Sequence, residues 1–240
     1  TPLQHGRYYT ETIAHLPGCY LPADSSIALR APPSRREAGL PAEGFVFCSF
    51  NNSYKFNPLV FDLWCRLLRE SEDSCLWLSQ PAGSADERLR HEAQARGVDP
   101  ARLVFAPRVE SRVAHLSRLQ LADLALDPFP YNSHSTGIDI LWAGVPMVAL
   151  LGDTFPGRVG ASALHAAGLD ELIAGSVDEY YRLAKALFGN PQRLQGLRRK
   201  LAENKHGCPL FDMPRFVRSL EELYFRMWDN HLKGTRVPLV

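Results

Sequence analysis

The sequence predicts a doubly wound α/β fold, with a six-stranded, parallel, Rossmann-like sheet and additional helices at the carboxyl terminus. Short apolar runs alternate with amphipathic stretches from Phe45 onward, and the connections between them are short. Such alternation favours parallel strands joined by right-handed crossover helices, which cover both faces of the sheet. The length of 240 residues is sufficient to bury a full core.

The predicted strands are apolar runs too short to be helices of ordinary length. They begin with FVFCSF and continue through CLWLSQ, LVFAP, LADLALD, PMVALLG and ELIA, at 45–50, 75–80, 103–107, 121–127, 146–152 and 171–174. Bounded apolar runs of this kind are typical of strands that are buried on both faces.

The predicted helices occupy the amphipathic stretches between and after these strands. Pro58 starts the first helix and Gly144 closes the short one, since Pro favours the first helical turn and Gly the position after the last. The ranges are 58–70, 85–96, 112–119, 137–144, 158–167, 176–188, 192–204 and 213–232. The last helix carries an apolar stripe that needs a surface to cover, formed by Phe216, Leu220, Leu223, Tyr224 and Met227.

Composition and missing motifs exclude several classes of function. The net charge of +1 provides no field for non-specific binding of nucleic acid or an anionic membrane, and no apolar run approaches the ~18 residues of a membrane span. Five cysteines without a CxxC pair indicate reduced, buried thiols in a cytoplasmic protein, with no zinc or redox site. Dinucleotide, P-loop, hydrolase and metal motifs (GxGxxG, GxxxxGK[ST], GxSxG, HExxH, DxD) are not found, so we expect no cofactor and no metal.

The segment 126–146 has the order of an anion site: strand, polar loop, short helix. Ser135 or Thr136 is expected to cap a helix that opens on Gly137, where free N–H groups and the helix dipole favour a phosphate. His134 stands just outside the helix end, and Asp139 is placed to accept hydrogen bonds from sugar hydroxyls. An ordinary capped helix is the alternative interpretation of this segment taken alone.

Two other loops are predicted to reach the same edge of the sheet. Asn52 and Lys55 follow the first strand, while Arg112 and His115 follow the third. Ligands of open parallel sheets bind beyond the carboxyl ends of the strands, so we expect these side chains to line one crevice. A diphosphate there would be neutralised by Lys55, Arg112 and helix N–H groups in place of magnesium, as suits metal-independent glycosyl transfer from a nucleotide-sugar.

These residues resemble the carboxyl-terminal half of the catalytic region of protein O-GlcNAc transferases, especially bacterial ones. The resemblance rests on FCSFNNSYKFNP, LVFAPRVESRVAHLSRLQLADLALD and NSHSTGIDILWAGVPMVALLGDTFPGRVGASALHAAGLDELIA, and covers about residues 8–188. It implies a GT-B glycosyltransferase, in which two Rossmann-like domains face each other across a cleft and the carboxyl-terminal one binds UDP.

The resemblance also implies roles for individual residues. Lys55 would stabilise the diphosphate in catalysis, Arg112 and His115 would contact the ribose and uracil region, and Asp139 would bind ribose hydroxyls. The HSTG loop, His134, Ser135, Thr136 and Gly137, would hold the phosphates. In two departures, Asn52 stands for the glutamine of the family and Arg112 for its lysine.

The family's other parts are not found in these residues, and we expect the chain to be the carboxyl-terminal part of a longer protein. Residues 1–44 would be a connector and the tail of an absent amino-terminal catalytic half, 45–208 the UDP-binding domain, and 209–240 a helix packing back across the domains. The implied partners are a UDP-sugar, an acceptor protein or peptide, the absent half and its helical repeats.

The predicted activity is the transfer of N-acetylglucosamine from UDP-GlcNAc to Ser or Thr hydroxyls of proteins, with inversion. Three alternatives remain: a related enzyme using another sugar, such as a fucosyl- or glucosyltransferase, a nucleotide-sugar-binding module without turnover, and a structural α/β domain.

Overall fold

A single parallel sheet of six strands forms the centre of the protein, as the sequence predicts. The computed structural model describes residues 1–235. The strand order is β3-β2-β1-β4-β5-β6, and every neighbouring pair is parallel. The strands are β1 (Phe45–Ser49), β2 (Ser74–Ser79), β3 (Leu103–Ala106), β4 (Leu124–Leu126), β5 (Met147–Leu150) and β6 (Ile173–Ala174). Chain order reverses between β1 and β4, so the loops after these two strands diverge and leave a crevice at the carboxyl edge.

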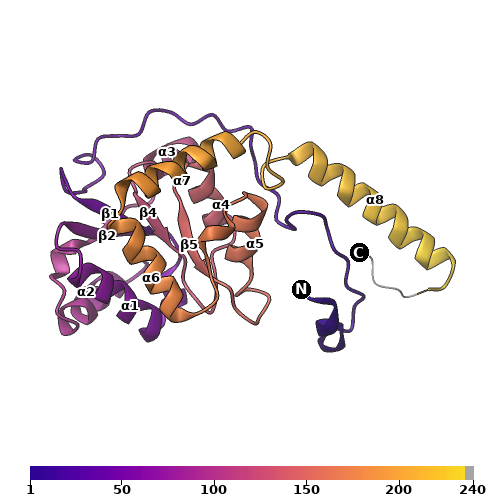
Figure 1. Cartoon of the computed structure of the whole chain (residues 1–240), viewed down its shortest axis with the longest axis horizontal. Helices are drawn as coiled ribbons and strands as arrows, with labels where there is room; N and C mark the ends of the chain where they lie inside the picture. Colours follow the sequence, from indigo (N-terminus) through magenta and orange to yellow (C-terminus); the bar gives the residue numbers. More distant parts are fainter. Residues whose placement is uncertain (236–240) are drawn as a thin grey trace.

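Helices cover both faces of the sheet (Figure 1). One face carries α1 (Pro58–Arg69), α2 (Ala85–Ala95) and α6 (Val177–Phe188), and the other α3 (Arg112–Leu119), α4 (Ser135–Trp142) and α5 (Val159–Ala166). α7 (Pro191–Asn204) packs on α6. The strands are buried between these layers, since the exposed fraction is 0% for Val46, Cys48, Trp77, Leu124 and Val148.

Local sequence explains where several helices begin. The side chains of Asn57, Ser111 and Ser176 accept hydrogen bonds from the third following N–H group, which caps α1, α3 and α6. Pro58 occupies the first turn of α1, where its missing N–H costs nothing. Strand β1 therefore leads directly into a short 3-10 turn, η2 (Ser53–Lys55), and a firmly anchored helix.

Three predicted boundaries differ from the structure for identifiable physical reasons, and others shift by one or two residues. The run 121–127 contributes only Leu124–Leu126 to the sheet, because residues 121 and 122 continue the turn that ends α3. The run 171–174 divides into a 3-10 turn, η4 (Asp170–Leu172), and a two-residue edge strand, β6. Helix α4 begins at Ser135 instead of Gly137, with His134 at the N-cap position and no side-chain cap.

The amino-terminal segment, residues 1–44, is mostly extended. After a 3-10 turn, η1 (Leu3–Tyr8), the amino-terminal segment runs over α4 and α3, where Trp142 Nε1 donates to the Ile27 carbonyl at 3.1 Å and the Arg30 N–H donates to Ser117 Oγ at 2.9 Å. Another short 3-10 turn, η3 (Pro100–Arg102), precedes β3. None of the described helices is both long enough and apolar enough to cross a membrane.

Helix α8 (Met213–Leu232) extends away from the sheet domain (Figure 1). Leu223 is its only buried residue within the described part, whereas Tyr224, Phe225 and Trp228 are 58%, 73% and 60% exposed. The predicted packing of 209–240 across two domains stays a prediction, and the last five residues of that segment lie outside the described residues.

Candidate functional site

Lys55 and the loop after β4 meet at the carboxyl edge of the sheet. The Lys55 ammonium donates to the Asn132 carbonyl at 2.8 Å and to Asn51 Oδ1 at 3.3 Å, and it lies 4.1 Å from the centre of the Tyr131 ring. Burial lowers the pKa of Lys55, and the carboxylate of Asp127 opposes that shift. The geometry holds a partly desolvated cation against the loop that leads into α4.

The start of α4 presents donors that have no partner. Gly137 N–H and Ile138 N–H donate to the His134 carbonyl, whereas within residues 1–235 no acceptor is assigned to the N–H of Ser135 or Thr136. These two groups lie at the positive end of the helix dipole. The predicted capping by Ser135 or Thr136 is wrong, because the helix begins two residues earlier than expected and leaves the N–H groups free.

His134 adds another free nitrogen at this point. Its Nε2 is buried and has no hydrogen-bond partner among the described residues, while its ring packs against Tyr131 and Phe155 at centroid distances of 5.3 and 6.4 Å. Burial and the charge of Lys55 lower the pKa of His134, and a hydrogen bond with the backbone of Pro156 opposes the shift. The ring is thus kept neutral beside a cation, and its unpaired Nε2 donates or accepts a hydrogen bond according to the tautomer.

The loop after β3 leads into α3, and an ion pair links the start of α3 to α4. Arg112 Nη2 donates to Asp139 Oδ1 at 2.8 Å, which brings two predicted site residues together as an ion pair. The Asp139 side chain is 12% exposed and that of Arg112 54%. Burial raises the pKa of Asp139, and Arg112 opposes the shift. The second oxygen of Asp139 is not used by this pair.

His115 lies deeper, one turn further along α3. Its Nδ1 is 3.1 Å from Arg118 Nη2, and its ring packs edge-on against Phe50 at 5.7 Å. Burial, helped by the charges of Arg118 and Arg112, lowers the pKa of His115 to about 4. His115 is therefore neutral at physiological pH, and its Nδ1 accepts the hydrogen bond from Arg118.

The structure brings most of the predicted residues to one edge of the sheet, where they form two groups with different neighbours. Lys55 and His134 border the β4–α4 loop, and Arg112 and His115 border α3. The Asn52 side chain is exposed and has no hydrogen bond assigned within residues 1–235, whereas the neighbouring Asn51 side chain accepts from Lys55. The predicted role of Asn52 stays a prediction.

Sequence reasoning missed several residues that shape this edge. Arg118 is spaced three residues from His115 on α3, so helical periodicity is a signal that identifies it. Asp127 and Ser133 lie at the two ends of the β4–α4 loop and are hydrogen-bonded to each other. Such a contact within a loop has no periodic signal in the sequence.

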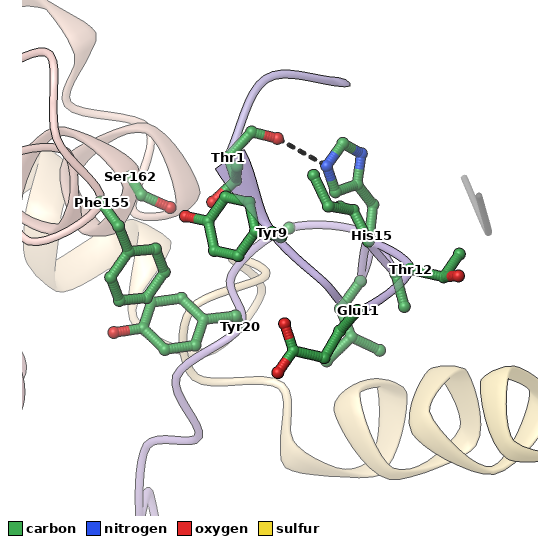
Figure 2. A pocket seen from close by; sticks show the side chains of 12 residues that line it. Thr1, Tyr9, Glu11, Thr12, His15, Tyr20, Phe155 and Ser162 are labelled. Atoms are coloured by element: carbon green, nitrogen blue, oxygen red, sulfur yellow. Dashed lines mark hydrogen bonds between the residues drawn. The ribbon is translucent and has the colours of Figure 1, made fainter. Parts of the chain in front are cut away.

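Two cavities flank the edge. One of about 520 Å³ lies between the amino-terminal segment and α5, where Figure 2 shows Tyr20 and Phe155 ring to ring along one wall and His15 Nε2 hydrogen-bonded to the Thr1 carbonyl at 2.7 Å. The other, of about 560 Å³, lies beside α3 and is lined in part by Ser111, Ala114 and Arg118. None of the predicted site residues lines either cavity, although Ser111 and Arg118 adjoin Arg112 and His115.

No metal site is apparent in the part of the chain that the structure describes, where no three or more His, Cys, Asp or Glu side chains gather as ligands. The five cysteines are all buried and unpaired. Lys55, Arg112 and the amino-terminal end of α4 bring positive charge to the edge.

Comparison with known proteins identifies a family profile and relatives that match this chain. The profile described as Glycosyl transferase family 41 matches residues 2–220. The chain is 38% identical over 241 residues to the probable UDP-N-acetylglucosamine--peptide N-acetylglucosaminyltransferase SEC of Arabidopsis thaliana, and 36% identical over 201 residues to the UDP-N-acetylglucosamine--peptide N-acetylglucosaminyltransferase of Caenorhabditis elegans. These matches cover 98% and 84% of this chain but only 25% and 17% of the two relatives, so the chain spans a quarter or less of their length.

Solved structures agree with the fold. A mutant of the Thermobaculum terrenum O-GlcNAc transferase matches with a TM-score of 0.84 and 29% identity, over 97% of this chain and 44% of that one. The Anabaena protein HepE in complex with UDP matches with a TM-score of 0.63 and 13% identity, over 85% of this chain and 56% of that one, which supports the fold alone. The family profile spans the whole sheet domain and the loops that carry the site, and the chain therefore belongs to glycosyl transferase family 41.

Proposed function

We propose that this chain is the donor-binding part of a protein O-GlcNAc transferase, the carboxyl-terminal half of a GT-B enzyme that moves N-acetylglucosamine from UDP-GlcNAc to Ser or Thr hydroxyls. Family membership and the names of the relatives support this assignment. The observation that carries it is a group of polar atoms at one point of the carboxyl edge: the donors of the Lys55 ammonium and the free N–H groups of Ser135 and Thr136, with the unpaired His134 Nε2 beside them.

The diphosphate of the donor binds at these groups. A helix end with free N–H groups and a positive dipole is a ready anion site, and a neighbouring ammonium adds charge-assisted hydrogen bonds. Lys55 is already held at the loop by the Asn132 carbonyl, so a phosphate oxygen needs little rearrangement to reach it. Partial burial of Lys55 strengthens this attraction, since the local dielectric is lower than that of water.

The nucleoside lies toward α3. Asp139 offers an acceptor oxygen beyond the one that Arg112 uses, which suits ribose hydroxyls. The cavity of about 560 Å³ beside α3 adjoins this point, and two of its lining side chains, Trp77 and Arg118, carry buried N–H groups (Nε1 and Nε) with no partner among the described residues. A base with carbonyl oxygens satisfies donors of this kind, because buried donors are rarely left unpaired.

The chemistry assigned to Lys55 is stabilisation of the leaving group. The acceptor hydroxyl oxygen attacks the anomeric carbon of the sugar from the side opposite the nucleotide, and the bond from that carbon to the β-phosphate oxygen breaks with its electron pair. The configuration is inverted, UDP leaves with added negative charge, and the hydroxyl proton passes to a base outside this chain. Lys55 and the helix N–H groups stabilise that charge without a metal ion.

The rest of the enzyme completes the reaction. An amino-terminal catalytic half would close the cleft, and helical repeats would gather the acceptor protein. The exposed aromatic side chains of α8, Tyr224, Phe225 and Trp228, offer a surface for the amino-terminal half. A cytoplasmic location agrees with the unpaired, buried thiols.

Calorimetric titration of the protein with UDP, GDP and UDP-GlcNAc tests the assignment, followed by transfer of labelled sugar from UDP-GlcNAc to peptides. We expect UDP and UDP-GlcNAc to bind more tightly than GDP, and labelled N-acetylglucosamine to reach Ser or Thr. Tight binding of UDP with no turnover on any acceptor would indicate a binding module, and transfer from another nucleotide-sugar would indicate a related transferase. Absence of nucleotide binding would leave only a structural domain.

A further inference from the structure

A fully buried carboxyl group lies at the base of the β4–α4 loop (residues 127–134). Asp127 is 1% exposed, and its Oδ1 accepts hydrogen bonds from the Ser133 N–H, at 2.6 Å, and from the Ser133 hydroxyl. Its Oδ2 has no partner within residues 1–235. Buried polar atoms are nearly always hydrogen-bonded, so an orphaned carboxylate oxygen beside a binding loop needs an explanation.

Close packing fixes this carboxyl group in position. Oδ2 faces the first turn of α5, where a methyl group on Gly160 would collide with it, so that element contributes backbone there. On the other side of the residue, the Asp127 carbonyl accepts the Tyr180 hydroxyl at 3.0 Å, and that hydroxyl accepts Trp64 Nε1 at 3.2 Å. The side chain therefore has little freedom to turn Oδ2 toward another donor.

The ionisation of the Asp127 carboxyl group is influenced by titratable groups on two neighbouring elements. Lys55 reaches it electrostatically from η2, and the Tyr180 hydroxyl does so from α6. Lys55 also lowers the pKa of His134, at the start of α4. Burial raises the pKa of Asp127 to about 7, while the Ser133 hydrogen bonds and the Lys55 charge oppose the rise. The ionisation of Asp127 thus depends on the charge of the residue assigned to the diphosphate.

We propose that Asp127 is a positioning residue whose carboxyl group becomes more protonated, with net uptake of a fraction of a proton from solvent, when the diphosphate of a nucleotide-sugar binds above it. This inference rests on the proposed function, because it needs the diphosphate at Lys55 and the start of α4. The bound anion brings negative charge close to a buried carboxylate and engages Lys55, and both effects favour the neutral acid. The proton neutralises the orphaned oxygen, while Oδ1 continues to accept from Ser133 and holds the loop for the ligand.

Calorimetry of UDP-GlcNAc binding in buffers of different ionisation enthalpy measures this proton uptake directly. UDP-GlcNAc is the probe because its diphosphate has no group that titrates near neutral pH. We expect net uptake of a fraction of a proton between about pH 6 and 8.5, with its maximum on the alkaline side of neutrality. Asp127→Asn keeps a similar shape and is expected to bind UDP-GlcNAc with the uptake lost. The matched control Asp178→Asn removes an 84% exposed carboxyl on α6 and is expected to retain it.

Each outcome of the titration bears on the proposal. Proton uptake that is absent in the wild type, or unchanged in Asp127→Asn, would overturn it. If Asp127→Asn fails to fold, Ser133→Ala takes its place: loss of the opposing hydrogen bond favours the acid, so the pH of maximal uptake is expected to move upward, and an unmoved maximum would overturn the proposal. A wild-type protein that does not bind UDP-GlcNAc would instead overturn the proposed function, and this inference with it.

Discussion

The Lys55 ammonium donates a 2.8 Å hydrogen bond to the carbonyl of Asn132, a residue 77 positions later in the chain. This bond joins the loops that follow β1 and β4, the adjacent strands between which the chain order reverses. A flexible lysine is thereby ordered before any ligand arrives, which lowers the entropy cost of binding.

Lys55→Ala is expected to lower turnover of the transferase by about 10- to 100-fold, since a charge-assisted hydrogen bond contributes about 1.5 to 3 kcal/mol. The free energy of unfolding is expected to change by less than about 1 kcal/mol, because removing the partly buried ammonium also removes its desolvation cost. Labelled-sugar transfer and urea unfolding measure the two effects. Lys200→Ala, which breaks a pair with Glu171 on the surface, is the control. Unchanged turnover in Lys55→Ala would remove this residue from the mechanism.

Asp139→Ala is expected to weaken UDP binding by about tenfold or more, through loss of a hydrogen bond with a charged acceptor. The ion pair between Asp139 and Arg112 should contribute little to stability. In a double-mutant cycle with Arg112→Ala, the coupling energy is expected to be about 0.2 to 1 kcal/mol, because Arg112 is 54% exposed and solvent screens its attraction to Asp139. Calorimetry and urea unfolding provide the two measurements. Wild-type UDP affinity in Asp139→Ala would contradict the ribose role.

Stability is expected to fall with acidification partly through His115. The pKa of His115 is lowered from 6.5 to about 4 in the folded protein, so the unfolded chain binds more protons between these values. The contribution is fully present above pH 6.5 and is lost as the pH falls toward 4. His115→Gln should therefore show a flatter dependence of unfolding free energy on pH in this window. Parallel curves for the two proteins would count against the shift.

Gly160→Ala is expected to destabilise the fold by about 1 to 3 kcal/mol, the usual cost of overpacking, because the added methyl group collides with Asp127 Oδ2. The matched control is Gly196→Ala on α7, where no neighbouring atom lies within 4 Å of the added methyl. Alanine there should stabilise by about 0.5 to 1 kcal/mol through its higher helix propensity. Equal unfolding midpoints for the two variants would contradict the tight packing at α5.

Sugar transfer is expected to persist in EDTA. Lys55, Arg112 and the α4 N–H groups provide the positive charge that the leaving diphosphate requires, and no cluster of metal ligands accompanies them in the described residues. Transfer rates with EDTA and with added magnesium should agree within about twofold. Loss of activity in EDTA that magnesium restores would show that a metal is needed.

Much of the fold follows from local sequence. Alternating apolar and amphipathic runs predicted six parallel strands with α1 to α8 in their correct order, and the structure confirms them. The bounds at 121–127 and 171–174 were wrong because an apolar run does not distinguish a strand from the buried turn beside it. Capping by Ser135 or Thr136 was wrong for a similar reason, since Ser and Thr favour helix starts without fixing which residue is first.

The sequence by itself determined the order of strands and helices, the carboxyl-edge loops and the residue types that a diphosphate needs, since these depend on periodicity and short-range signals. Only the tertiary structure decided that Lys55 bonds to Asn132, that Arg112 pairs with Asp139, and that Asp127 is buried with one oxygen unpaired. Those contacts join segments brought together by strand pairing and helix packing. Their geometry depends on the whole core, which no local pattern encodes.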